Sequence, residues 1–167
     1  MLFRSPGAVA AAGLLAMLTL GGWIFYNTNV INEYRTTLDV ERETAETERA
    51  LIGYEAVPQP RITDVQLEVA LYPAESRAVT RGEYVVENRT GQPLAEVHVR
   101  WPDLLEMTEL EVEGATLSLD LGARHYRIYR YDTPLEPGAR HRIRFATLRG
   151  QRGFRNSGNE QIGRAHV

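Results

Sequence analysis

The longest apolar run of the chain, Ala8–Tyr26, carries no charged side chain and constrains the fold more than any other feature. At 1.5 Å rise per residue, about 19 helical residues cross roughly the 30 Å hydrocarbon core of a bilayer. Trp23 and Tyr26 close the run, where rings with an apolar body and a polar edge favour the headgroup level. Because Arg4 precedes the run and Asn27-Thr28-Asn29 follow it, the positive-inside bias predicts a cytoplasmic amino terminus.

Two other interpretations of this run are weaker. A cleaved signal peptide would end in a small-x-small site, but the run exits through Phe25-Tyr26-Asn27. A buried core helix would be shorter and would carry a polar stripe. We therefore predict that residues 1–26 form a cytoplasmic tip and a single transmembrane helix in a cell inner membrane. The later residues are then extracytoplasmic.

Composition excludes several classes of protein. The 167 residues leave, beyond the anchor, enough chain for one domain of ordinary size. Cysteine is absent from the sequence, which excludes a disulfide framework, a thiolate metal site and a cysteine nucleophile. The net charge is −3 and the basic side chains, all arginine, are scattered, which argues against a nucleic-acid partner.

Residues 27–60 are predicted to form a helical stalk and a proline linker. Apolar residues recur at helical spacing from Val30 to Leu38, and Thr36–Ala50 is rich in Glu, Arg and Ala without Gly or Pro. The pattern predicts that the membrane helix continues outward as the stalk. Pro58-Gln59-Pro60 ends it, because proline supplies no amide hydrogen and biases the preceding residue towards extended geometry.

From Arg61 the hydrophobic period changes to two, as in strands with one buried face. Short strands separated by Gly, Pro and Asn turns continue to residue 149 and predict a mainly β fold, an antiparallel β-sandwich over 61–149. Leu110–Val112 and Thr116–Leu119, which flank Gly114, are expected to form a hairpin-like pair. The predicted core consists of Val65, Leu67, Val69, Tyr84, Val86, Val97, Val99, Leu110, Val112, Ile128, Ile143 and Phe145.

Asn88-Arg89-Thr90 has two interpretations. It is formally a sequon for N-glycosylation, and it also belongs to a turn by composition, together with Gly91, Gln92 and Pro93. The turn is sufficient to explain these residues, so we favour it over the sugar.

The sequence carries no pattern for a known type of catalysis. It lacks the HExxH zinc motif, the GxSxG nucleophile elbow, the Walker A loop and the dinucleotide fingerprint. A zinc motif of this kind needs two histidines one helical turn apart beside a glutamate. No pair among the four histidines has this spacing: His98, His125, His141 and His166. His98 lies between Val97 and Val99 and is expected to be a surface histidine on the polar face. We predict no catalytic, cofactor-binding or metal-ligating residue in this chain.

The segment from Pro58 to Asn156 combines a patterned opening strand with short blocks spaced along the later strands and loops. These blocks are residues 60–73, Arg81-Gly82-Glu83-Tyr84, Asn88-Arg89-Thr90, Val97-His98-Val99, residues 110–114, Tyr126-Arg127-Ile128-Tyr129 and residues 134–138. In these blocks the segment resembles the amino-terminal domain of gluzincin aminopeptidases, the aminopeptidase N family. The anchor and stalk, from Gly22 to Asn29 and Asn32-Glu33-Tyr34, resemble bacterial proteins that fuse an ABC transporter permease to such a peptidase region.

This resemblance implies a junction fragment: the last permease helix, the stalk and the first extracytoplasmic β-domain of a larger membrane protein. It implies as partners the lipid bilayer, the catalytic domain of the same protein and an ABC ATPase subunit. The family's zinc ligands, general-base glutamate and amine-binding loop lie in a later domain, so zinc is expected only there. In the family the β-domain packs on the catalytic domain and closes one side of its cleft. The role implied here is therefore support of a zinc metallopeptidase domain.

The end of the chain resembles an artefact of sequencing. Gln161–Val167 matches a common sequencing adapter read in one frame and followed by a stop codon. Residues 150–160, rich in Gly, Arg and Asn, are expected to be an irregular truncated segment, with the natural sequence ending near Asn159 or Glu160. A second hypothesis remains open, in which this is a complete single-pass protein whose sandwich binds a protein partner. Both hypotheses predict an exposed apolar strip on the sandwich.

Overall fold

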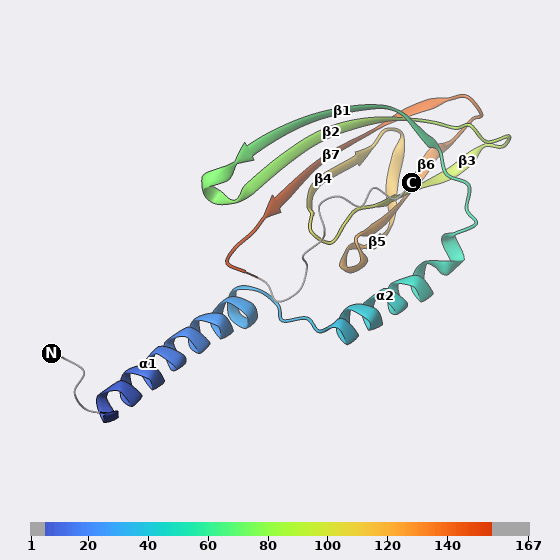
Figure 1. Ribbon diagram of the computed structural model, residues 1–167. Coiled ribbons are helices and arrows are strands. Elements are labelled where there is room, and N and C mark those ends of the chain that lie inside the picture. The colour runs from blue at the N-terminus through green and yellow to red at the C-terminus, as the bar shows by residue number, and fades with distance from the viewer. Residues whose placement is uncertain (1–5, 155–167) are drawn as a thin grey trace. The chain divides into compact units, whose positions relative to one another are not determined.

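The computed structural model describes residues 6–154, which fall into two compact units. One unit comprises the described residues up to Ala45 and those from Gln151 on, and the other is Glu46–Gly150. The predicted fold class is confirmed: the chain is mainly β, with antiparallel sheets preceded by helices (Figure 1). The expected adapter segment, most of the expected irregular segment 150–160 and His166 lie outside the described residues.

Helix α1 (Pro6–Phe25) continues into one π-helical segment, η1 (Tyr26–Ile31). Together they are long and apolar enough to cross a membrane, a test of length and composition that a secretory signal sequence also passes. At the end of α1 the side chains compete for backbone carbonyls: Asn27 Nδ2 donates to Trp23 O at 2.9 Å and Thr28 Oγ1 to Ile24 O at 2.9 Å. Such bonding from Asn and Thr side chains favours irregular helix ends, and it accompanies the wider π turn here.

The predicted continuous stalk is wrong, because α2 (Thr37–Leu51) is a separate helix. Residues 32–36 are not helical. Thr36 and Asp39 cap the new helix reciprocally: the Asp39 amide donates to Thr36 Oγ1 at 3.2 Å, and the Thr36 amide donates to Asp39 Oδ2 at 3.0 Å. This capping pair fixes a helix start that the charge pattern alone did not locate.

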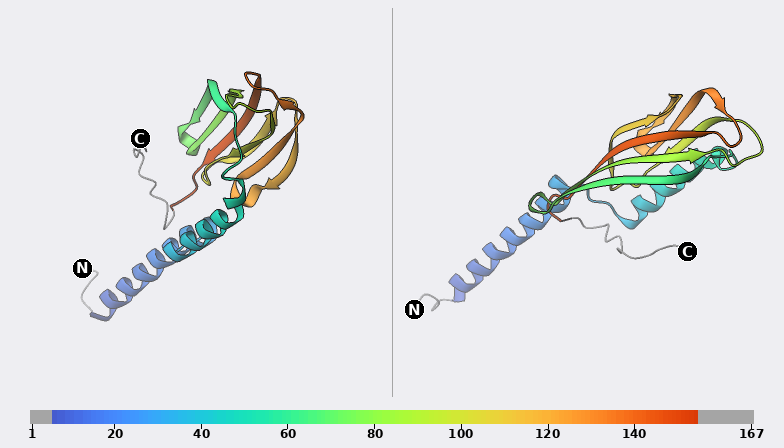
Figure 2. Two further views of the ribbon diagram at one scale, coloured as in Figure 1. Left: turned by 90° about the vertical axis from the view of Figure 1, so that its right-hand side faces the viewer. Right: turned by 90° about the horizontal axis from the view of Figure 1, so that it is seen from above.

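Seven strands form two antiparallel sheets, one of four strands in the order β1-β2-β7-β4 and one of three in the order β3-β6-β5. Figure 2 shows β1, β2 and β7 running side by side as long, curved strands. The strands are β1 (Arg61–Tyr72), β2 (Arg77–Glu87), β3 (Leu94–Arg100), β4 (Glu106–Val112), β5 (Ala115–Leu121), β6 (Tyr126–Leu135) and β7 (Arg140–Gly150).

The chain changes sheet at Gly114, so the expected hairpin of β4 and β5 is wrong. β4 pairs with β7, whereas β5 pairs with β6 in the other sheet. Gly114 has a φ of +65°, which a residue with a side chain rarely adopts. The turn was correctly located from the sequence, but its local composition does not determine which sheet the next strand joins.

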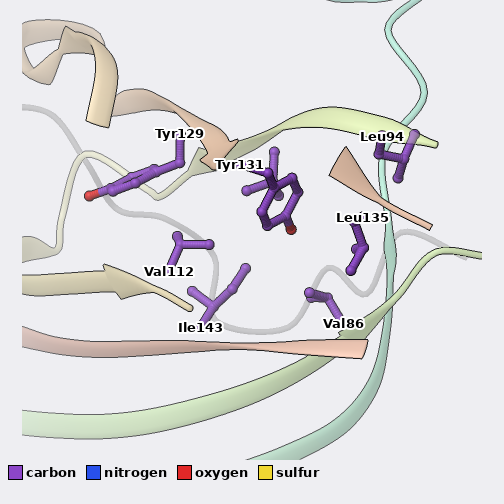
Figure 3. Close-up of a cluster of buried hydrophobic side chains, with 8 residues drawn as sticks. Val86, Leu94, Val112, Tyr129, Tyr131, Leu135 and Ile143 are labelled. Carbon is purple, nitrogen blue, oxygen red and sulfur yellow. The ribbon is translucent and has the colours of Figure 1, made fainter. Parts of the chain in front are cut away.

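The core lies between the two sheets (Figure 3). Val86, Val112 and Ile143 of the four-stranded sheet point towards Tyr129 and Tyr131 of β6. Leu94, Val97 and Leu135 complete the cluster of buried residues. The hydroxyl of Tyr129 donates a hydrogen bond to Leu110 O at 3.1 Å, so this polar group is satisfied within an apolar core.

The predicted core is confirmed in part. Val86, Val97, Val112 and Ile143 are buried in the cluster, with Tyr84, Val99 and Leu110 partly buried against it. Ile128 is buried but pairs with His98, whereas the core-facing Tyr129 pairs with Val97. Since paired residues of neighbouring strands share a face, Ile128 lies on the side of the sheet opposite the core. The three core residues predicted on β1 are not buried.

Candidate docking surface on strand β1

The apolar side chains of β1 are exposed. Val65 is 50% exposed, Leu67 54%, Val69 52% and Leu71 69%. The alternation of the strand correctly indicates that these residues share one face, but nothing in the described residues covers that face. A contiguous row of half-exposed large aliphatic residues is unusual on the surface of a monomeric protein, which makes this face a candidate docking surface.

Close packing joins this face of β1 to the neighbouring strands of the four-stranded sheet. Leu67 is opposite Gly82 on β2, and Gly82 is opposite Phe145 on β7. The Phe145 ring lies where a Cβ of residue 82 would be, and it packs on Tyr84 with ring centroids 4.7 Å apart. The exposed row on β1 therefore adjoins the rings of Tyr84 and Phe145, which lie on the same face of the sheet.

An apolar hollow of about 390 Å³ opens beside this row, between the two sheets. Its lining is mostly aliphatic and aromatic, and the side chains of both sheets contribute to it. Contributing residues include Leu67, Tyr84, Val99, Trp101, Met107 and Phe145. The hollow and the row together form an apolar surface suited to protein side chains rather than to a charged ligand.

The edge strands β3 and β1 differ in whether another residue covers their outer side. On β3, the amide of His98 donates to Oε1 of Gln59 at 2.8 Å, so the linker residue covers part of that edge. β1 is at an edge of its sheet, and within residues 6–154 it pairs with β2 alone. Its outer edge thus presents backbone donors and acceptors to solvent.

The prediction that His98 is a surface histidine is wrong. Its side chain is only 6% exposed, with Nε2 3.0 Å from Oε1 of Glu96 and Nδ1 2.6 Å from the hydroxyl of Tyr126. Tyr54 covers the ring edge-on, with centroids 5.5 Å apart. A neutral imidazole protonated at Nε2 satisfies both contacts, since the phenol donates to Nδ1 and Nε2 donates to the carboxylate.

This cluster is a structural anchor for the linker. Burial raises the pKa of Tyr126, with the nearby Tyr54 and Glu96 adding to the effect, so the phenol stays protonated. Tyr54 and Gln59, both from the segment before β1, contact His98 on β3. No local sequence pattern signals this cluster, because Tyr54, which covers the ring of His98, lies far from it in the chain.

The remaining described histidines are dispersed. Nε2 of His125 lies 3.6 Å from Oδ1 of Asp103, and His141 packs edge-on against Tyr131. Within residues 6–154 there is no group of three or more His, Asp or Glu side chains that could hold a metal ion. The arrangement of the described residues therefore offers no metal centre for hydrolysis.

The outer face of the four-stranded sheet is polar and salt-bridged. Arg140 and Arg89 donate to Glu87, and their bonds lower the pKa of that carboxyl, Arg140 most. Arg144 donates to Glu83 at 3.0 Å in a cross-strand pair. These are exposed ion pairs between strands, each of modest effect on stability.

Asn88 is a structural residue of the turn, as the composition of residues 88–93 predicted. It is 1% exposed, and its Nδ2 donates to Leu135 O at 2.7 Å and to Gln92 O at 2.9 Å. Its Oδ1 accepts from the amide and the hydroxyl of Thr90. An amide so enclosed is not accessible for a sugar in the folded protein.

These features define a two-sheet antiparallel β-domain with an exposed apolar strand. No protein-family model matches the sequence, and no curated protein matches it. Among solved structures, the chain is similar to an M1 zinc metallopeptidase from Deinococcus radiodurans, at 14% identity and a TM-score of 0.42. It is also similar to a mutant of an M1 zinc metallopeptidase from the same organism bound to a Tyr-Ser-Ala substrate, at 13% identity and a TM-score of 0.43. Each match covers 56% of this chain, which spans only 21% of the length of those proteins.

Proposed function

We propose that this chain is a membrane-anchored, non-catalytic β-domain that docks onto a protein partner through the apolar face of β1. The observation that carries the proposal is the exposure of Val65, Leu67, Val69 and Leu71, each at least half open to solvent. Left uncovered, such a row favours aggregation, and burying it against a partner removes the apolar surface from water.

The proposed setting is an inner membrane, with the amino terminus in the cytoplasm and the β-domain outside it. Support comes from the helix Pro6–Ile31, which is long enough to cross a bilayer, and from Arg4 on its amino-terminal side. A Val30→Cys variant tests the orientation, because Val30 is 61% exposed and lies beyond the apolar core of the helix. An impermeant maleimide should label it from outside intact cells, whereas labelling only after lysis would reverse the topology.

The proposed partner is the catalytic domain of a zinc aminopeptidase-like protein in which an ABC permease precedes this domain. The sequence resemblance over residues 58–156 and in the juxtamembrane segment supports this setting. The β-domain would support the peptidase domain, and the permease part would bind an ABC ATPase subunit. Sequencing the genomic locus beyond codon 159 tests the proposal, which requires an open frame that reaches an HExxH motif.

A binding measurement tests the docking surface itself. The peptidase domain encoded downstream should bind the full chain in detergent, and Leu71→Glu should weaken this binding because it places a charge on the apolar face. Gln66→Ala, on the opposite face of the same strand, is the control and should bind as the wild type does. Equal binding by both variants would exclude the β1 face as the docking surface.

A second candidate is a complete single-pass protein whose sandwich binds a separate protein. The same exposed row on β1 favours it, so the two candidates differ in where the partner is encoded. A stop codon in the genome close to codon 159 would favour this second candidate.

A further inference from the structure

The free edge of β1 is unusually long for an unprotected edge strand. β1 has 12 residues, about twice the mean strand length. Its one irregularity in pairing lies between Ile62 and Asp64, so residues 65–72 are regular. Edge strands in natural proteins are commonly protected by shortness, proline, charged side chains, bulges or inward-facing charges. From Val65 to Tyr72, Glu68 is the one charged side chain, no proline or bulge interrupts the strand, and the inward side chains Val65, Leu67, Val69 and Leu71 are all aliphatic.

We propose that two copies of this chain pair edge to edge through β1, antiparallel and about a two-fold axis at Leu67. In this register Leu67 is opposite the partner's Leu67, and Val65 is opposite the partner's Val69. Their apolar faces lie on the same side of the joined sheet, since paired residues share a face. The four-stranded sheets of the two copies thereby form one sheet of eight strands.

The charges of β1 disfavour two of the neighbouring registers. A two-fold axis at Gln66 would place Asp64 opposite the partner's Glu68, and an axis at Glu68 would place this residue opposite itself. Both arrangements set like charges directly against each other, which is destabilising. With the axis at Leu67, Gln66 is opposite the partner's Glu68 and Asp64 is opposite the partner's Ala70. Arg81, opposite Glu68 on β2, supplies positive charge beside the carboxylates of this edge.

Length also favours the axis at Leu67. An axis at Val69 avoids opposed like charges as well, but it would pair only residues 66–72. The axis at Leu67 uses nearly the whole strand and so satisfies more backbone groups. Because the contact is isologous, the same β1 edge of both copies is paired, so no free β1 edge remains and assembly stops at a dimer. The proposal concerns the edge of β1, whereas the proposed function concerns its face, so either can fail alone.

Single cysteines test the register, because the 167 residues of this chain include no cysteine. The full chain carrying Leu67→Cys is purified in detergent and oxidised with copper phenanthroline, and disulfide dimers are followed on non-reducing gels. Opposed residues of antiparallel strands have Cα atoms about 4.5–5.5 Å apart, within the range for a disulfide. Leu71→Cys is the matched control on the same face: it is more exposed, at 69% against 54%, but in this register it does not meet its own copy. Its distance to the partner's residue 71 would be roughly 27 Å.

We expect Leu67→Cys to form dimers at least roughly tenfold faster than Leu71→Cys, since only the former is within bonding distance. A mixture of Val65→Cys and Val69→Cys chains should form a mixed disulfide, which keeps the test open if Leu67→Cys folds poorly. Light scattering of the unmodified chain in detergent should give the mass of two chains. Equal rates for the Leu67 and Leu71 variants, a monomeric mass, or a series of larger oligomers would overturn the proposal.

Discussion

The ring of Phe145 occupies the space above Gly82, so that a Cβ at residue 82 would approach Phe145 Cζ to 2.2 Å. The same Cβ would lie 2.8 Å from a methyl group of Leu67. We therefore expect Gly82→Ala to lower the free energy of unfolding by roughly 1–3 kcal/mol, because the ring and the leucine must move apart. Urea denaturation followed by circular dichroism measures this effect. Gly91→Ala is the matched control, because its Cβ would meet nothing within 4 Å. An equal loss in both variants would contradict the packing described for Phe145.

Asn88 should be among the most sensitive polar residues of the domain. Replacing it by Ala removes the donor to Leu135 O and the acceptor for Thr90, and leaves buried backbone groups without partners. We expect Asn88→Ala to lower the free energy of unfolding by about 1–3 kcal/mol. Arg89→Ala, at the neighbouring exposed position of the same turn, should cost much less. Mass spectrometry should find no sugar on Asn88 in cells that glycosylate, and a glycosylated, folded product would contradict its burial.

Tyr131 should make the domain sensitive to alkaline pH. Burial raises its pKa to about 12 from the ordinary value of 10.0, and its hydroxyl has no hydrogen-bond partner in the described structure. Between these values the folded state binds the phenolic proton more tightly than the unfolded state does. Stability is therefore fully present below pH 10 and falls as the pH rises towards 12.

Tyr131→Phe is the variant that isolates this effect. It should be as stable as the wild type or more stable at neutral pH, because it removes a buried hydroxyl without a partner. Its decline in stability above pH 10 should be shallower than that of the wild type, as measured by denaturant unfolding at each pH. A strongly destabilised Tyr131→Phe variant would mean that the hydroxyl makes a bond that stabilises the fold.

The chain by itself should neither hydrolyse peptides nor need zinc. Zinc hydrolysis uses about three protein ligands and an open position for water, and residues 6–154 hold no such group of side chains. The purified chain should release no amino acid from peptide amides with or without added zinc. Its melting temperature should be the same in chelator, because no folding energy depends on a metal. Zinc-dependent turnover abolished by chelation would contradict this prediction.

Much of the fold could be predicted from the sequence, because its period and its breakers are local signals. The apolar run Ala8–Tyr26 and the strand alternation from Arg61 predicted a helix and an antiparallel β fold. The break before α2 was missed, although Thr36 and Asp39 have the spacing of a capping pair. Periodicity gave the type of each element more reliably than its ends.

For the candidate docking surface, the sequence predicted which side chains of β1 share a face but not whether that face is covered. Alternation placed Val65, Leu67 and Val69 on one face but could not tell whether another element covers that face. The burial of His98 depends on Tyr54, a contact across the chain that no local pattern encodes. An exposed apolar strip was expected, but its position on β1 required the structure.

We expect the apolar face of β1 to be covered by protein in the membrane. Cysteine accessibility measures this directly, with Leu71→Cys on that face and Gln66→Cys on the opposite face as reference. Both variants are expressed from the gene's own locus, and their labelling by an impermeant maleimide is compared with that of the isolated chain in detergent. We expect Leu71→Cys to label slowly in native membranes and rapidly in isolation, with Gln66→Cys unchanged. Equally rapid labelling of both cysteines in native membranes would show that the β1 face is uncovered there.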